Sequence, residues 1–149
     1  MDENIINKMT VTFDSRSGVE SLARMVASAF LVQADPTLDE LDDIKTAISE
    51  AVTNSIVHGY GVKGDERGAG DVCMELTLHS DCLEIRISDS GCGISDVPRA
   101  MEPFYSGDPS GERSGMGFTL MQAFMSEIRV ASAPGEGTCV WMKKNFSGR

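Results

Sequence analysis

The sequence predicts an α+β fold: a two-layer sandwich in which helices cover one face of a mostly antiparallel sheet. Stretches with an apolar residue at every second position alternate with stretches of helical spacing, in the order β-α-α-β-β-α-β-β. Two of the strand pairs are close enough along the chain to form hairpins. With 149 residues, 41% of them hydrophobic, the chain can bury one core, so we expect a single domain over 1–149.

The first two expected elements are a strand and a helix. Residues 9–13 alternate apolar side chains with threonines, as in a strand with one buried face. Ser17 and Glu20 are spaced as a capping box, in which each side chain bonds the backbone amide of the other. Apolar residues at helical spacing then predict an amphipathic helix over about 18–32.

A second helix start lies at Asp35-Pro36-Thr37, with a cap residue and a proline suited to a first helical turn. This longer helix is expected to continue to about His58 and to end at Gly59. Its core face is predicted from four residues at helical spacing: Leu41, Ile44, Ile48 and Val52.

The second half of the chain begins with a glycine-rich polar segment, 61–70, which we expect to be an exposed loop. Further elements follow from the same spacing rules: a hairpin of strands at 72–78 and 83–87, a short helix at 96–101, a helix at 116–126, and a last hairpin at 128–130 and 140–142.

The charge balance excludes some classes of partner. Lys and Arg number 13 and Asp and Glu 23, so 13 − 23 gives a net charge of −10. A direct nucleic-acid binder needs clustered basic residues, and an anionic membrane surface would repel this chain. The acidic, polar start and the absence of a long apolar stretch predict a cytoplasmic protein. We therefore expect reduced, structural thiols at Cys73, Cys82, Cys92 and Cys139.

A polar stripe on the long helix is the first candidate functional feature. Glu50 lies opposite the core face, and Asn54 and His58 follow it at i+4 and i+8. The simplest interpretation is a solvated helix face. However, Ala47, Ala51 and Ser55 flank the stripe and would leave room for a ligand, and a carboxylate one turn from a carboxamide can serve as general base beside a cation ligand.

Two glycine motifs are the other candidates. Asp89-Ser90-Gly91-Cys92-Gly93 directly follows a strand and can let a flat ligand approach the backbone, although such a pattern alone is more often a turn. The segment 111–118, with Gly115 and Gly117, runs into a helix start, where backbone amides and the helix dipole can bind an anion. Its simplest interpretation is a helix entry loop.

The motifs form an ordered series: Glu-x3-Asn on a helix, Asp-x-Gly-x-Gly after a strand, Gly-x-Gly before a helix, and Gly137-Thr138 in the last hairpin. In this order and spacing, over nearly the whole chain, the sequence resembles the GHKL (Bergerat-fold) ATP-binding family of gyrases, Hsp90 chaperones, histidine kinases and MutL proteins. Within it, DPTLDEL (35–41), SEAVTNSIVHGY (49–60) and ERSGMGF (112–118) are similar to the anti-sigma F factors of endospore-forming bacteria, which are serine-protein kinases and sigma-factor inhibitors.

The resemblance implies a GHKL-type sandwich that binds ATP or ADP with Mg²⁺. Glu50 would be the catalytic general base on a serine hydroxyl, and Asn54 would also be the metal ligand. Asp89 would accept from the adenine amino group, assisted through water by Thr138. The nucleotide-binding residues implied in this way are Asn54, His58, Asp89, Gly91, Gly93, Arg113, Ser114, Gly115, Gly117 and Thr138.

The family's lid over ATP corresponds to residues 102–117, whose glycine content suits a segment that closes and reopens. The sequence departs from the family here. Tyr105-Ser106-Gly107-Asp108-Pro109 stands where related proteins commonly carry Thr-Thr-Lys-Pro, so a basic phosphate contact is missing and an acidic residue, Asp108, stands beside that point.

The resemblance also implies the partners: a sporulation sigma factor, a small STAS-type anti-anti-sigma protein as the phosphorylated substrate, and a second copy of the chain. Arg24, expected to be exposed on the first helix, would contact both protein partners, and strand 9–13 with that helix would form the homodimer interface. Two alternatives stay open. The altered lid favours a non-enzymatic, nucleotide-sensing anti-sigma module. A detached histidine-kinase catalytic domain is less well supported, because neither His58 nor His79 lies in a phosphoacceptor helix bundle.

Overall fold

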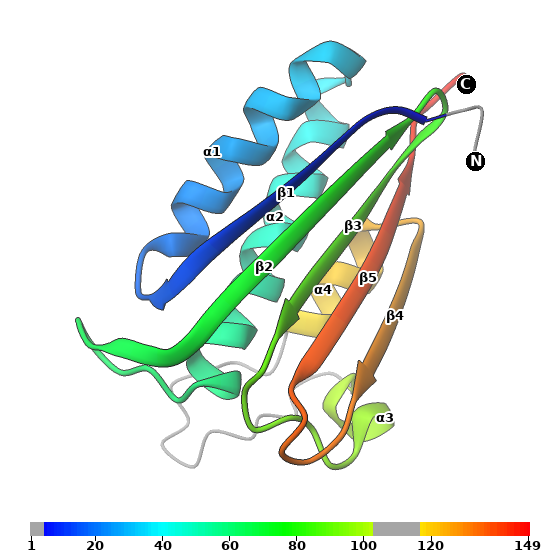
Figure 1. The fold of residues 1–149 in the computed structure, drawn as a ribbon. Coiled ribbons are helices and arrows are strands. Elements are labelled where there is room, and N and C mark those ends of the chain that lie inside the picture. Colours follow the sequence, from blue (N-terminus) through cyan, green and yellow to red (C-terminus); the bar gives the residue numbers. More distant parts are fainter. Residues whose placement is uncertain (1–4, 103–116) are drawn as a thin grey trace.

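Five strands form one antiparallel sheet in the computed structural model, which describes residues 5–102 and 117–149 (Figure 1). The order across the sheet is β1-β2-β3-β5-β4. β1 and β4 are therefore the edge strands, and β5 lies between β3 and β4. The strands are β1 (Ile5–Arg16), β2 (Arg67–His79), β3 (Cys82–Asp89), β4 (Glu127–Ser132) and β5 (Thr138–Asn145).

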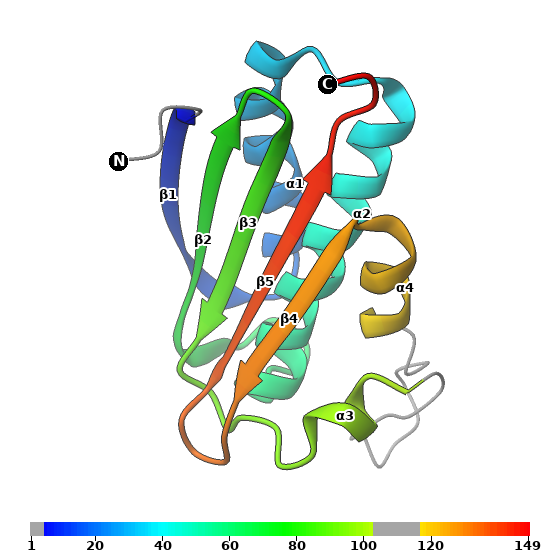
Figure 2. The same cartoon turned by 90° about the vertical axis from the view of Figure 1, so that its right-hand side faces the viewer.

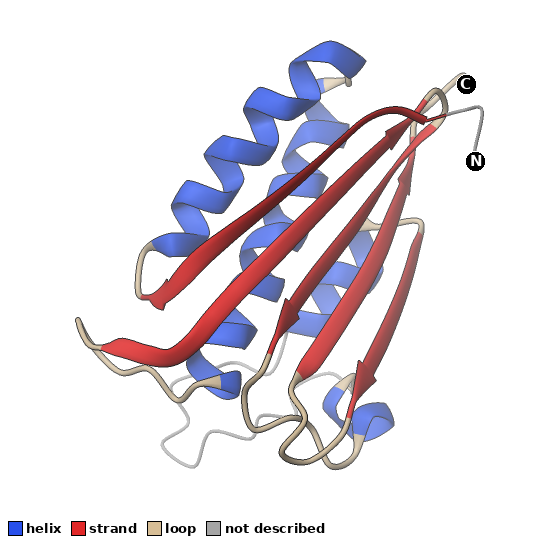
Figure 3. Cartoon of the chain, viewed as in Figure 1, coloured by secondary structure: helices blue, strands red, loops and turns tan. Residues whose placement is uncertain are grey.

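The longer helices pack on one face of this sheet and leave the other face open (Figures 2 and 3). α2 lies between α1 and α4, against the middle of the sheet. The predicted fold class and element order are confirmed. The helices are α1 (Val19–Leu31), α2 (Leu38–Asn54), α3 (Val97–Ala100) and α4 (Gly117–Phe124), with a 3-10 turn, η1 (Val32–Ala34), after α1 and a π-helical turn, η2 (Ser55–Gly59), after α2.

The core lies between the two layers and follows the predicted periodicities. Every second residue of β2 from Val72 to Leu78 is fully buried, and Ile44, Ile48 and Val52 of α2 pack against this face. Ala47 and Ala51 are also core residues, at 0% and 1% exposure. The prediction that these alanines leave room for a ligand is therefore wrong, because their small size serves close packing of α2.

The predicted capping box at the start of α1 is only half correct. The N-cap is Gly18, in the left-handed conformation at φ 93°, and it has no side chain to cap with. Glu20 does reach back, since its Oε2 accepts from the Gly18 amide at 3.1 Å. The helix begins one residue later than the Ser17 pattern predicts, so the Ser17 hydroxyl is not the cap.

The start of α2 has a complete capping box, built by Thr37 and Glu40 rather than by Asp35. Thr37 Oγ1 accepts from the Glu40 amide at 3.1 Å, and Glu40 Oε1 accepts from the Thr37 amide at 2.8 Å. The other oxygen, Oε2, accepts from the Ser147 amide at 2.6 Å. Burial raises the pKa of Glu40, but these bonds outweigh it and hold the pKa below its ordinary value. Glu40 thus joins the helix start to the C-terminal segment.

Three other boundaries differ from the predictions. The helix predicted to end at Gly59 is α-helical only to Asn54, and the π-helical turn η2 continues it to Gly59, with Tyr60 N donating to Ser55 O. β2 begins at Arg67, so the second half of the predicted 61–70 loop is strand. The described part of the predicted 116–126 helix ends at Phe124.

The four cysteines are free thiols, as predicted. Within 5–102 and 117–149, no helix has the length and apolar character needed to cross a membrane.

Candidate active site

The polar stripe of α2 meets the start of α4. Glu50 and Asn54 are half-buried near the end of α2, and the first residue of α4, Gly117, is buried against them. A Cβ on Gly117 would lie 3.2 Å from both Glu50 Oε2 and Asn54 Nδ2. The absence of a side chain at Gly117 therefore lets a helix N-terminus approach a carboxylate and a carboxamide directly.

The Asp89–Gly93 motif packs on the π-turn that follows Asn54. Cys92 N donates to Gly59 O at 2.8 Å, and Cys92 Sγ donates to the carbonyl of His58 at 3.1 Å. A Cβ on Gly91 would lie 2.2 Å from Gly59 O, so only glycine fits there. Asp89 lies against Gly59 in turn, with Oδ1 only 3.1 Å from where a Gly59 Cβ would be. The π-turn η2 thereby connects the Glu50–Asn54 pair at the end of α2 to Asp89.

The last hairpin completes this end of the sheet. Asp89 and Thr138 are direct partners across β3 and β5, so their side chains share a face. Asp89 lies two residues after the core residue Ile87, and Thr138 lies two residues before the core residue Val140, so both point to the same face of the sheet as the core and the helices. Gly137, at φ 81°, would place a Cβ 2.1 Å from Asp89 O, and Gly93 would meet Ala133 O at 1.9 Å. These two close backbone approaches hold the Asp89–Gly93 loop against the β4–β5 turn, and we call this region the Asp89 corner.

The described residues of the predicted site therefore lie near one another at one end of the sheet, linked by the approaches above: Glu50, Asn54, His58, Asp89, Gly91, Gly93, Gly117 and Thr138. Arg113, Ser114, Gly115 and Ser106 lie outside the described residues, as does nearly all of the predicted lid. Ser55, predicted to flank the polar stripe and leave room for a ligand, is buried at 5% exposure.

Two residues at this corner had no functional signal in the sequence. Tyr60 Oη accepts from the Ser90 amide at 2.7 Å and donates to the Asp71 carbonyl at 2.7 Å, which ties the Asp89 loop to β2. Ser132 Oγ contacts the Ile94 amide, the Gly137 carbonyl and the Thr138 hydroxyl. Tyr60 ends the 49–60 run that resembles the anti-sigma F factors, but no spacing pattern assigns a role to it or to Ser132, so the hydrogen bonds identify both.

Arg24 is half-buried rather than exposed as predicted. Its Nη1 donates to Ser49 Oγ on α2 at 2.7 Å, and its Nη2 donates to Ser21 Oγ at 3.0 Å. The guanidinium is therefore held between α1 and α2, and its partner on α2, Ser49, is the residue before Glu50.

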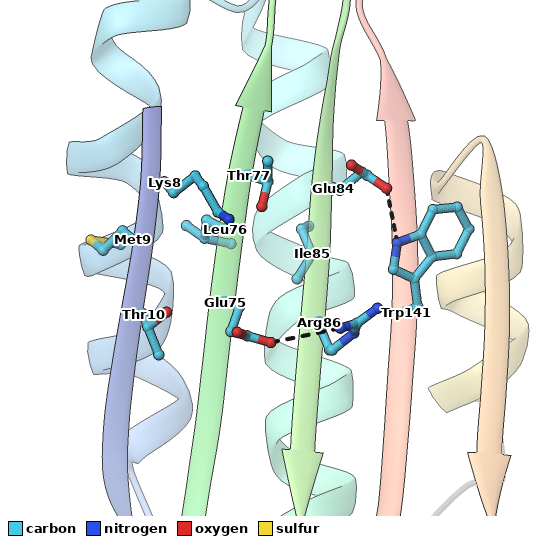
Figure 4. Close-up of a pocket in the computed structure, with 10 residues that line it drawn as sticks. All are labelled: Lys8, Met9, Thr10, Glu75, Leu76, Thr77, Glu84, Ile85, Arg86 and Trp141. Atoms are coloured by element: carbon cyan, nitrogen blue, oxygen red, sulfur yellow. Dashed lines mark hydrogen bonds and ion pairs between the residues drawn. The ribbon is translucent and has the colours of Figure 1, made fainter. Parts of the chain in front are cut away.

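The open face of the sheet, on the side away from the helices, carries a separate polar hollow (Figure 4). Trp141 Nε1 donates to Glu84 Oε1 at 3.2 Å, and Arg86 lies 4.0 Å from Glu75. None of the predicted site residues that the structure describes lines the hollow, which is bounded by Lys8, Met9, Thr10, Glu75, Leu76, Thr77, Glu84, Ile85, Arg86 and Trp141. In the described part of the chain, no group of three His, Cys, Asp or Glu side chains is placed to hold a metal ion.

Comparison with known proteins identifies the family. Residues 15–144 match the histidine kinase-like ATPase domain. The anti-sigma F factor of Clostridium beijerinckii is 49% identical over 141 residues, covering 95% of this chain and 96% of that protein. The anti-sigma F factor of Oceanobacillus iheyensis is 48% identical, covering 95% and 94%.

Solved structures agree on the fold. The RsbU and RsbW domains of a Mycobacterium tuberculosis protein superpose with a TM-score of 0.66 at 19% identity, covering 94% of this chain and 32% of that one. A blue-light activated histidine kinase from Erythrobacter litoralis gives 0.53 at 20% identity, covering 87% and 61%. The chain therefore belongs to the histidine kinase-like ATPase domain family and, within it, to the family of anti-sigma F factors.

Proposed function

We propose that this protein is a cytoplasmic anti-sigma factor that inhibits a sporulation sigma factor. We propose also that, as an ATP-dependent serine kinase, it phosphorylates and inactivates a STAS-type anti-anti-sigma protein. The relatives are named anti-sigma F factors, and the family is one of ATPase domains. The observation that carries the kinase proposal is the contact of Gly117 with Glu50 and Asn54, which joins a potential base, a potential metal ligand and a helix N-terminus.

These residues suit phosphoryl transfer to a hydroxyl. Glu50 would accept the proton of the substrate serine, whose Oγ then forms a bond to the γ-phosphorus while the bond to the β–γ bridging oxygen breaks and ADP leaves. Asn54 offers a carboxamide oxygen, and the family's Mg²⁺ would supply charge neutralisation on the phosphates. The backbone amides at the start of α4 would face the same phosphates. A net charge of −10 is no obstacle, because these groups act locally.

The Asp89 corner suits the base of the nucleotide. An ionised carboxylate is only an acceptor, so Asp89 would accept from the amino group of adenine. Gly91 and Gly93, which must be glycine for the packing described above, would let the base lie against the backbone.

The surface of α1 suits a protein partner. Leu22 and Met25 of α1 are 50% and 70% exposed and lie on one helical face, and Val32, the first residue of η1, is 76% exposed at the end of this helix. Arg24 lies beside this face and is linked to Ser49, next to Glu50. A partner bound on α1 would thus lie near the catalytic carboxylate. We propose that α1 and the edge strand β1 serve both partner binding and a homodimer.

Transfer of labelled phosphate from ATP to a STAS-type anti-anti-sigma protein tests the kinase. We expect phosphoserine with the native chain. In Glu50→Gln the rate of serine phosphorylation should fall at least about a hundredfold, whereas this variant should still bind ADP. Asp42→Asn, which neutralises an exposed carboxylate on the same helix, is the matched control and should stay active. Equal phosphoserine formation by both variants would contradict the role of Glu50 as the base. No phosphoserine with the native chain while ADP still binds would favour the non-enzymatic, nucleotide-sensing alternative, and phosphohistidine in place of phosphoserine would favour the histidine-kinase alternative.

Pull-down from sporulating cells tests the partners. With ATP the native chain should retain a sigma factor, and with ADP an anti-anti-sigma protein. Arg24→Ala should weaken both, whereas Arg86→Ala on the open sheet face should weaken neither. Recovery of the same partners by both variants would contradict the role of α1.

A further inference from the structure

Ser132 makes three polar contacts at the corner where the proposed adenine site lies. Its Oγ is 2.8 Å from the Ile94 amide nitrogen, 2.9 Å from the Gly137 carbonyl oxygen and 2.8 Å from Thr138 Oγ1. Ser132 is half-buried in the edge strand β4, directly opposite Thr138 of β5. One hydroxyl thus joins the loop after Gly93, the β4–β5 turn and the Thr138 side chain.

The chemistry of these groups determines which atom donates in each contact. A serine hydroxyl has one proton to donate and two lone pairs to accept with. The Ile94 amide can only donate, and the Gly137 carbonyl can only accept. The Ser132 proton therefore goes to Gly137 O, one lone pair accepts from Ile94 N, and the second lone pair accepts from Thr138. Any other assignment would leave two acceptor oxygens in contact with no proton between them.

This arrangement commits the Thr138 proton to Ser132. Toward the site, Thr138 Oγ1 then presents only lone pairs, and the neighbouring Asp89 carboxylate is likewise an acceptor. A group bound between them must donate. The 6-amino group of adenine donates, directly or through a water, whereas the 6-oxo group of guanine or hypoxanthine accepts and would face two acceptors.

We infer that Ser132 is a specificity-determining residue: by holding the Thr138 hydroxyl as an acceptor, it makes the site select a 6-amino purine over a 6-oxo purine. This rests on the proposed nucleotide site. Ser132 need not touch the nucleotide and acts through Thr138, so it is a positioning residue.

The test compares binding of ADP and inosine diphosphate by calorimetry, since the two share their ribose and phosphates and differ at the purine 6-position and its N1 proton. The native chain should prefer ADP. In Ser132→Ala the Thr138 hydroxyl can rotate and donate. We therefore expect ADP affinity to fall about three- to tenfold, and the ratio of ADP affinity to inosine diphosphate affinity to fall by at least the same factor. Thr138→Val should also narrow the preference, and adding Ser132→Ala to it should then change the preference no further.

The outcomes separate the two ideas. If the native chain binds neither nucleotide, the proposed nucleotide site is wrong. If the native chain prefers ADP but Ser132→Ala weakens ADP and inosine diphosphate equally, Ser132 has only a structural role and the inference is overturned. Urea unfolding of each variant verifies folding, and Thr138→Val, which leaves the Ser132 contacts to Ile94 and Gly137 in place, provides the test if Ser132→Ala does not fold.

Discussion

Two glycines in the β4–β5 turn separate the cost of a left-handed backbone from the cost of a close approach. Gly135 and Gly137 have φ values of 76° and 81°, so alanine at either position carries the left-handed penalty of about 1–2 kcal/mol. A Cβ at Gly135 meets nothing within 4 Å. A Cβ at Gly137 would lie 2.1 Å from Asp89 O and 2.9 Å from Ser90 Cα. The backbone of β3 would have to move away, because neither atom belongs to a side chain that can rotate.

We therefore expect Gly135→Ala to lower the free energy of unfolding by about 1–2 kcal/mol and Gly137→Ala to lower it by about 1–3 kcal/mol more. Urea unfolding at pH 7 measures both. Since the displaced atom belongs to Asp89, ADP affinity should fall about tenfold or more in Gly137→Ala and stay unchanged in Gly135→Ala. Equal destabilisation of the two variants, with equal ADP affinity, would refute the view that this approach positions Asp89.

Three further predictions concern other elements. Gly117→Ala should leave the free energy of unfolding within about 1 kcal/mol of the native value, yet slow serine phosphorylation about tenfold because the added Cβ would displace Glu50 and Asn54. An unchanged rate in the Gln122→Ala control would show that the effect depends on the position of Gly117. Glu40→Gln should lower the free energy of unfolding by about 2 kcal/mol at pH 7. Because the pKa of Glu40 in the folded protein is lowered, its contribution is present above the ordinary value of 4.5 and is lost as pH falls through the folded pKa. The difference in free energy of unfolding between native and variant should therefore close in acid, and a constant difference would argue against this role. Burial raises the pKa of Cys82 to about 11, so iodoacetamide at pH 8 should modify exposed Cys92 well before Cys82, as peptide mass spectrometry would show.

Local spacing in the sequence was enough to predict the class of fold, the order of its elements and the core face of α2. Alternating apolar residues specify which face of a strand is buried, and helical spacing does the same for α2. Errors occurred where two local signals overlapped. Ser17 and Gly18 are both acceptable helix caps, as are Asp35 and Thr37, and the choice depended on where each helix packs. Thr37 is the cap of α2 because Glu40, its partner in the capping box, also bonds the distant Ser147 amide.

By itself, the sequence determined the residue types of the candidate site: the Glu50–Asn54 pair, the Asp89 loop, and the glycines. Only the tertiary structure decided which of them touch. Gly117 meets Glu50 because α4 packs on α2, and Thr138 faces Asp89 because β5 pairs with β3. The roles of Tyr60 and Ser132 emerged in the same way. Contacts between residues far apart along the chain depend on the order of the strands in the sheet and on where glycines let two backbones approach. Local sequence patterns predict neither of these.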